Sequence, residues 1–153
     1  MRNRNILLTL FLSCVPFKLL QAQQTVFSPG IKLGYTFGED GGFTYGFEFS
    51  YVIKLEGNRD TDIAGLYIGP VFDIDFSKHF QRIHFGLEAG TGPFGVCFGP
   101  SFVSVLGEAY QSGYSVIPYA GLLAYPYYNF TKVGEVTFRE WGSYFKYHIG
   151  KGI

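Results

Sequence analysis

Large side chains alternate with small or polar ones along the segment from Gly42 to Leu55, which reads GFTYGFEFSYVIKL. Every second residue from Phe43 to Tyr51 is aromatic, and the positions between them carry glycine, hydroxyl groups and the carboxylate of Glu48. Because successive side chains of a strand point to opposite faces, this period of two predicts a β-strand. One face of that strand carries rings, and the other carries small and polar groups.

The same alternation predicts further strands along the chain, at residues 31–37, 64–76, 82–90, 94–102 and 141–149. Turn-forming sequences separate them, at residues 39–42, 56–62, 77–81, 91–93 and 107–113. The segment 114–138 leaves two interpretations open, one long strand or two short ones, because Pro118, Gly121 and Pro126 interrupt it. Seven strands are therefore predicted, and an eighth if this segment divides.

The first 22 residues have a different character and predict an export signal. Arg2 and Arg4 precede the apolar run ILLTLFLSCVPF, which is too short to cross a membrane as a helix but suits a signal-peptide core. We expect cleavage after Ala22, which leaves a single domain at 23–153; the alternative is a buried N-terminal helix. Cys14 raises the question of lipidation, although Phe11 stands where a lipoprotein motif prefers leucine.

Composition supports an all-β exported domain. Aromatic residues make up 20% of the chain and charged residues 16%, with 21 glycines, a balance that favours strands and turns over helices. After cleavage Cys97 is the one cysteine, so no intramolecular disulfide is expected. Lys and Arg do not cluster, which argues against a nucleic-acid partner.

Short linkers between strands predict an antiparallel meander with no crossover helix. Removal of 22 of the 153 residues leaves 131. Eight strands of roughly 11 residues with short turns use about 130 residues, and bacterial membrane barrels have even strand numbers. We therefore predict an all-β, antiparallel, up-and-down β-barrel, transmembrane and most simply eight-stranded.

Alternation alone does not say which face points inward, because a soluble lipocalin-like barrel fills its interior with apolar side chains. Eight strands enclose a space just wide enough for side chains, which stacked rings would overfill. The glycines on the other face, such as Gly34, Gly46 and Gly86, make room for larger polar groups. This favours rings that meet lipid around a polar lumen.

The predicted lumen network comprises Lys32, Glu48, Lys54, Asp73, Asp75, Arg82, His84, Glu88, Lys146 and His148. The predicted lipid-facing aromatics are Tyr35, Phe37, Phe43, Tyr45, Phe47, Phe49, Tyr51, Phe72, Phe85, Phe98, Phe145 and Tyr147. An aromatic girdle near the strand ends is expected from Tyr35, Tyr51, Tyr125, Tyr127 and Trp141.

The chain resembles the small outer-membrane β-barrel proteins of Gram-negative bacteria, in their porin-like and OmpA-like superfamily. The resemblance rests on the signal sequence through Ala22, on GIKLGYTFG and GGFTYGFEFSY, and on the closing EWGSYFKYHIGKGI. It implies an outer-membrane location, contact with outer-membrane lipid and insertion by the barrel-insertion machinery. Members of this group usually end on an aromatic residue, whereas this chain ends on Ile153.

Little in the sequence indicates chemistry. The chain has three histidines and lacks a G-x-S-x-G motif, so we expect no catalytic residues. Neither H-x-x-H spacing nor a cysteine cluster occurs, so no metal and no cofactor are predicted. Eight strands leave no wide pore. Three hypotheses remain: a structural or interaction barrel in the outer membrane, a soluble exported barrel that binds an apolar ligand, and an outer-membrane lipid-modifying enzyme.

Overall fold

A computed structural model describes residues 25–38, 41–55, 65–105, 107–121 and 124–150 of the chain. These residues form strands and connecting turns, and among them no helix is long and apolar enough to cross a membrane. The strands are β1 (Thr25–Phe37), β2 (Gly42–Leu55), β3 (Leu66–Ser77), β4 (Phe80–Thr91), β5 (Phe94–Val105), β6 (Gln111–Ala120), β7 (Tyr125–Val133), β8 (Val136–Lys146) and β9 (Ile149–Gly150).

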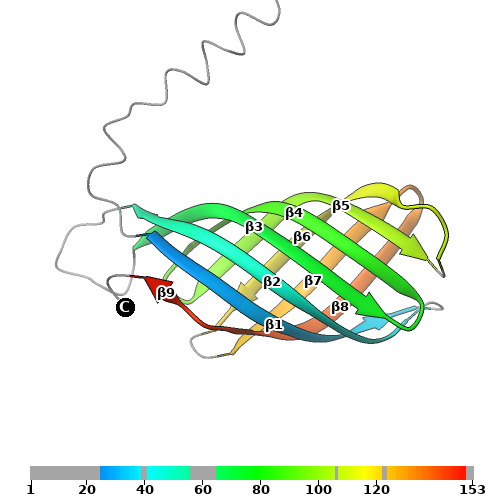
Figure 1. Cartoon of the computed structure of the whole chain (residues 1–153), viewed down its shortest axis with the longest axis horizontal. Helices are drawn as coiled ribbons and strands as arrows, with labels where there is room; N and C mark the ends of the chain where they lie inside the picture. The colour runs from blue at the N-terminus through cyan, green and yellow to red at the C-terminus, as the bar shows by residue number, and fades with distance from the viewer. Residues whose placement is uncertain (1–24, 39–40, 56–64, 106, 122–123, 151–153) are drawn as a thin grey trace, which may run out of the picture.

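Each strand pairs antiparallel with the next one along the chain, from β1 to β8. The sheet closes because β1 pairs with β2 on one side and with β8 on the other. Figure 1 shows the resulting barrel, whose strands run obliquely to its long axis, as closure of a twisted sheet requires. The fold is an eight-stranded antiparallel up-and-down β-barrel, as the sequence predicted.

The short strand β9 continues β8 along the same neighbour. Gly30 pairs with Lys146 of β8, and Phe27 pairs with Ile149 of β9, so the register on β1 is unchanged across the break. Pro29 lies opposite the break. Its carbonyl accepts a hydrogen bond from the Tyr147 amide at 2.9 Å, but proline has no N–H to return one. The interruption therefore follows from one proline.

The open segment 114–138 divides into two strands and the start of a third. β6 ends at Ala120, β7 covers Tyr125–Val133, and β8 begins at Val136. Pro118 lies within β6 rather than ending it, where it pairs with Val96 of β5. The register between β6 and β7 has no pairing at Pro118, so the missing N–H falls on that side. The eighth strand comes from this division.

Other strand boundaries differ from the predicted ones at their ends. β1 begins at Thr25, six residues before the predicted start at Ile31, because Pro29 and Gly30 are accommodated within the strand. Two residues, Gly92 and Pro93, connect β4 to β5, and Gly134 and Glu135 connect β7 to β8. Gly92 and Gly134 have φ of 53° and 56°, the left-handed conformation that tight hairpin turns demand. The predicted signal segment 1–22 lies outside the described residues.

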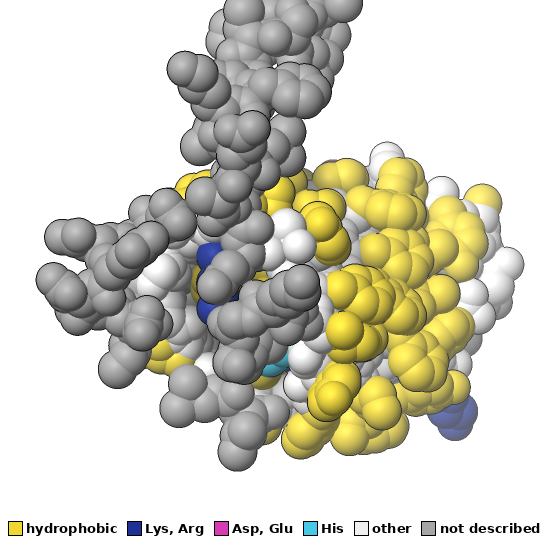
Figure 2. Space-filling model, turned by 60° about the vertical axis from the view of Figure 1, so that its left-hand side comes forward, with side chains coloured by type: hydrophobic (Ala, Val, Ile, Leu, Met, Phe, Trp, Pro, Cys, Tyr) yellow, Lys and Arg dark blue, Asp and Glu magenta, His cyan; other side chains and the backbone are white. Residues whose placement is uncertain are grey.

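The two faces of the barrel wall are chemically opposite. On β2, Phe43, Tyr45, Phe47, Phe49 and Tyr51 are exposed, whereas Thr44, Gly46, Glu48 and Ser50 between them are buried. Figure 2 shows a broad apolar surface over the side of the barrel. The buried face includes Lys32, Asp75, Arg82 and Glu140 together with several tyrosines, so most of the charges on the strands lie inside, whereas the outer face is mainly apolar.

Candidate functional site

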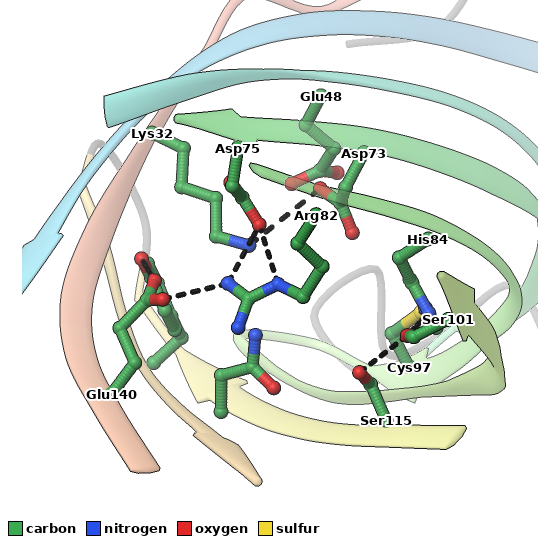
Figure 3. Close-up of polar contacts among 12 residues, drawn as sticks. Lys32, Glu48, Asp73, Asp75, Arg82, His84, Cys97, Ser101, Ser115 and Glu140 are labelled. Atoms are coloured by element: carbon green, nitrogen blue, oxygen red, sulfur yellow. Dashed lines mark hydrogen bonds and ion pairs between the residues drawn. The ribbon is translucent and has the colours of Figure 1, made fainter. Parts of the chain in front are cut away.

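Charged side chains from β1, β2, β3, β4 and β8 meet inside the barrel, and this interior is the candidate site (Figure 3). The strand register explains how they meet. Lys32 pairs with Gly46, Gly46 pairs with Asp75, and Asp75 pairs with Arg82, so one row crosses four strands. Because Gly46 has no side chain, the Lys32 ammonium reaches over β2 to Asp75.

We call the first cluster the Arg82 network: Lys32, Asp75, Arg82, Thr131 and Glu140. Arg82 Nε and Nη2 donate to Asp75 Oδ2 at 2.9 and 2.6 Å, and Nη2 also donates to Glu140 Oε2 at 2.6 Å. Lys32 Nζ donates to the same Asp75 oxygen at 3.0 Å, and Arg82 Nη1 donates to Thr131 Oγ1 at 3.3 Å. Two cations therefore face two carboxylates, and the cluster is balanced in charge.

A second row with the same arrangement lies two residues further along the shared strands β1, β2 and β3. Lys146 of β8 pairs with Gly30, Gly30 pairs with Glu48, and Glu48 pairs with Asp73. Lys146 Nζ again reaches over a glycine and lies 2.5 Å from Glu48 Oε1. It also donates to Glu88 Oε1 at 3.1 Å. We call Glu48, Asp73, Glu88, Tyr119 and Lys146 the Lys146 network.

The Lys146 network holds three carboxylates and one cation. Tyr119 donates its hydroxyl hydrogen to Glu88, and Lys146 Nζ lies 4.9 Å from the centre of the Tyr119 ring. Asp73 is fully buried, and neither of its carboxylate oxygens accepts a hydrogen bond from the described residues. Its ion pair with Lys32 Nζ is long, at 4.0 Å. Charge is therefore unbalanced in this half of the interior.

A chain of neutral polar groups runs from His84 of β4 across β5 and β6 to Thr131 of β7, which belongs to the Arg82 network. His84 Nε2 lies 3.1 Å from Cys97 Sγ, and its Nδ1 lies 2.9 Å from Ser101 Oγ. Ser101 Oγ is 2.5 Å from Ser115 Oγ, and Ser115 Oγ is 2.6 Å from Thr131 Oγ1. His84, Ser101 and Cys97 are all buried, so this trio of catalytic residue types lies inside the barrel.

Tyrosines fill most of the remaining space beside the ions. The Tyr127 and Tyr144 rings pack in a tilted arrangement with their centres 4.4 Å apart, and the Lys32 ammonium lies 4.9 Å from the centre of the Tyr127 ring. Tyr127 donates its hydroxyl hydrogen to Glu140. A methyl group at Gly34 would lie 2.6 Å from the Tyr127 hydroxyl oxygen, so this glycine admits the ring.

The girdle prediction is wrong for Tyr127, whose side chain is 1% exposed and lies in the interior. Tyr125 is half-buried and bonds His148 Nε2 at 2.9 Å, so it also belongs to the inner side. The alternation does not place these two tyrosines, because the prolines of segment 114–138 leave its register open. Among the predicted outward aromatics, Phe72 is half-buried because it packs between Phe49 and Phe85, and the others are exposed.

The predicted lumen residues are distributed as follows. Lys32, Asp75 and Arg82 lie in the Arg82 network; Glu48, Asp73, Glu88 and Lys146 lie in the Lys146 network; His84 lies in the neutral chain. His148 bonds Ser28 Oγ through Nδ1 at 2.6 Å, near the chain ends, and Lys54 is half-buried toward the end of β2.

Sequence reasoning missed Glu140, although it lies two residues before Gly142 on the same face of β8. Extending the alternation of the last strand backwards would have found it. Tyr144 lies between Gly142 and Lys146 on the face that alternation predicts to be inside. Tyr119 and Tyr127 gave no such signal, because the prolines of segment 114–138 interrupt its alternation. No group of three or more His, Cys, Asp or Glu side chains is arranged to hold a metal ion in the described ranges.

Comparison with known proteins gives little further information. No family model matches the chain, and no curated protein matches it. A structural match was found with Ail, the attachment invasion locus protein of Yersinia pestis, at 11% sequence identity. It covers 84% of this chain and 99% of that one, with a TM-score of 0.28, which is too low to support an inference. The barrel assignment rests on the strand pairings of the chain itself.

Proposed function

We propose that this chain is an outer-membrane β-barrel with a packed polar lumen and a structural or interaction role, and that it is not an enzyme. The proposal rests on one observation: the barrel wall exposes apolar side chains and buries charged ones, which is the reverse of a water-soluble protein. Phe43, Phe94 and Phe98 are each about 60% exposed, while Lys32, Asp75 and Glu140 are fully buried. Such a wall is suited to the hydrocarbon core of a lipid bilayer.

The outer surface is far too apolar for water. Monomeric soluble proteins rarely expose continuous apolar patches above a few hundred Å². Here exposed rings or aliphatic side chains occur on seven of the eight long strands, all except β7. These strands contain 9 to 14 residues, and a tilted strand of about 9–11 residues spans a bilayer. Closure leaves no unpaired sheet edge to meet lipid.

The filled interior supports a role other than a wide pore. The two ion networks occupy the middle of the lumen. Towards the end where β7 turns into β8, the apolar side chains Phe80, Val103, Val133 and Phe138 pack together as a plug. Their burial supports a closed interior, and the buried trio of His84, Cys97 and Ser101 supports a structural use of those groups.

The proposal includes export by the N-terminal segment and insertion by the barrel-insertion machinery, with membrane lipid as the surrounding partner. A soluble exported barrel would place apolar groups inside and bind an apolar ligand there. The ions inside this barrel argue against that alternative, because a charged, hydrogen-bonded lumen does not suit an apolar ligand.

Depth-dependent sensitivity to charge tests the proposal. Phe98→Lys places a cation on the outer face of β5, near the middle of the strand. Ser112→Lys is the matched control and places a cation on the outer face at the start of β6. In a bilayer the first substitution is expected to cost about 2–4 kcal/mol and the second about 0–1 kcal/mol. The measurement is denaturant unfolding of protein refolded into lipid vesicles, with heat-modifiable gel migration as the check on insertion. Equal, small costs for the two substitutions in vesicles, or gel migration that heating does not change, would overturn the proposal.

A further inference from the structure

Among the described strand residues, two charged side chains lie on the outer face of the barrel, Lys132 of β7 and Arg139 of β8. Both are exposed, both are cations, and they occupy neighbouring strands. Acidic side chains are absent from that face in the same residues. The charge asymmetry is confined to one place, the end of the barrel where Gly134 and Glu135 connect β7 to β8.

The register places these two cations diagonally across the strand pair. Lys132 lies opposite Thr137, and Arg139 lies opposite Phe130, so each is two positions from the partner of the other. Diagonal neighbours on one face are about 7–8 Å apart at the backbone, within reach of long side chains. Neither cation forms an ion pair with a residue that the structure describes, so one anion between them would satisfy both.

Aromatic residues with polar edges lie beside the cations, toward the middle of the barrel. Tyr114 of β6 pairs with Lys132. Trp141, two residues from Arg139 on the same face, packs edge-on against Tyr128 with ring centres 5.5 Å apart. Trp and Tyr rings prefer the boundary between head groups and hydrocarbon. Their position next to the cations places Lys132 and Arg139 at head-group depth.

We propose that Lys132 and Arg139 bind the phosphate of an anionic membrane lipid, with Tyr114 and Trp141 against its upper acyl region. The inference rests on the proposed function. Arginine binds phosphate oxygens in a bidentate fashion, and lysine adds a point charge. The occupant is a lipid because the two cations stand on the apolar wall, next to rings, rather than in the hairpin turn where a soluble anion has free access.

Trp141 is the one tryptophan of the chain, so its fluorescence reports on this site alone. The full-length mature protein is refolded into phosphatidylcholine vesicles that contain either phosphatidylglycerol or phosphatidylcholine brominated in the acyl chains. Bromine quenches tryptophan at contact, so the quenching curves give the relative affinity of the two lipids at the site. We expect a clear preference for brominated phosphatidylglycerol.

Single charge removals identify the residues responsible. Lys132→Gln and Arg139→Gln are each expected to reduce the preference about fivefold, because one cation near an anionic surface contributes about that factor. The matched control is Lys78→Gln, which removes one exposed cation from the turn between β3 and β4, at the same end of the barrel. It is expected to leave the preference unchanged.

The outcomes separate this inference from the proposed function. Equal quenching by both lipids, or an equal loss of preference in Lys78→Gln, would overturn the phosphate site and leave the membrane barrel standing, because Trp141 still contacts lipid. No quenching by either lipid, together with gel migration that heating does not change, would overturn the membrane barrel itself.

Discussion

The two ion networks in the barrel share a plan and differ in their balance. In each, a lysine reaches across a glycine on the intervening strand to an acid two strands away: Lys32 over Gly46 to Asp75, and Lys146 over Gly30 to Glu48. The Arg82 network pairs two cations with two carboxylates. The Lys146 network gives one cation three carboxylates.

The hydrogen bonds follow that difference. In the Arg82 network, both oxygens of Glu140 and one of Asp75 accept hydrogen bonds. In the Lys146 network, Asp73 accepts none from the described residues, and Glu48 has a close ion pair without hydrogen-bond geometry. Pairing and hydrogen bonds offset the desolvation cost of a buried charge, and a buried charge that lacks them is strongly destabilising. The Arg82 network should therefore hold the barrel together more firmly.

Removing the central arginine should give the largest effect. Arg82→Met leaves Asp75 and Glu140 facing each other with Lys32 as the remaining cation, so we expect a loss of about 3–5 kcal/mol in the free energy of unfolding. Unfolding by guanidinium in detergent micelles, followed by Trp141 fluorescence, measures it.

Arg82→Lys serves as the control, because it keeps the charge and loses the fork that joins Asp75 to Glu140. Its loss should be smaller than that of Arg82→Met. If both variants unfold with the wild-type midpoint, the Arg82 network does not stabilise the barrel and the comparison fails.

The alternation in the sequence predicts the strands and their faces, but it does not predict which residues of neighbouring strands pair to form these networks. β2 has the predicted bounds, Gly42–Leu55, because its period of two is unbroken. That Lys32 meets Asp75 depends on two registers, β1 to β2 and β2 to β3, and a shift of one residue in either would turn the side chains to the other face. Alternation fixes the face of each residue within a strand, and only pairing fixes its neighbours.

In the segment 114–138 the sequence does not even predict which residues face inward. Its prolines obscure the period of two, so the sequence predicts Tyr127 in the aromatic girdle, whereas its hydroxyl group donates to Glu140 in the interior. Proline is compatible with a strand when its missing N–H falls where the ladder has no bond, as at Pro118. That condition depends on the neighbouring strand, which the local sequence does not contain.

Substitution by alanine should lower the free energy of unfolding more at Gly46 than at Gly30, the two glycines that the lysines cross. At Gly46 an added Cβ would lie 2.5 Å from Asp75 Oδ1 and closer still to the backbone oxygen of Ile74, which cannot move freely. At Gly30 it would lie 3.2 Å from the flexible Lys146 Cγ and 3.3 Å from the backbone oxygen of Phe145, so both contacts are longer than those at Gly46. We expect Gly46→Ala to cost about 1–3 kcal/mol and Gly30→Ala to cost less than about 1 kcal/mol, by the same unfolding measurement.

Equal losses for the two alanine variants would mean that glycine acts here through strand propensity alone. The row geometry, in which each lysine crosses a strand through a space without a side chain, would then carry no special stability. A larger loss for Gly30→Ala would reverse the ranking of the two networks.

A substitution at Asp73 should change the stability in the opposite direction. Asp73 lies directly opposite Glu48 on the neighbouring strand, and both side chains are buried. Asp73→Asn removes the carboxylate that accepts no hydrogen bond from the described residues, and its amide can donate to Glu48. We expect a gain of about 1 kcal/mol at neutral pH, the net value of one buried hydrogen bond.

Asp75→Asn is the matched control for this prediction, two residues along the same face of β3 and with the same change of charge. It breaks the ion pairs with Arg82 and Lys32, so it should destabilise the barrel by several times the amount that Asp73→Asn stabilises it. Equal losses from the two asparagine variants would show that Asp73 is as well paired as Asp75. The two networks would then stabilise the barrel equally. Protons or bound cations would have to neutralise the extra carboxylates of the Lys146 network, Asp73 included.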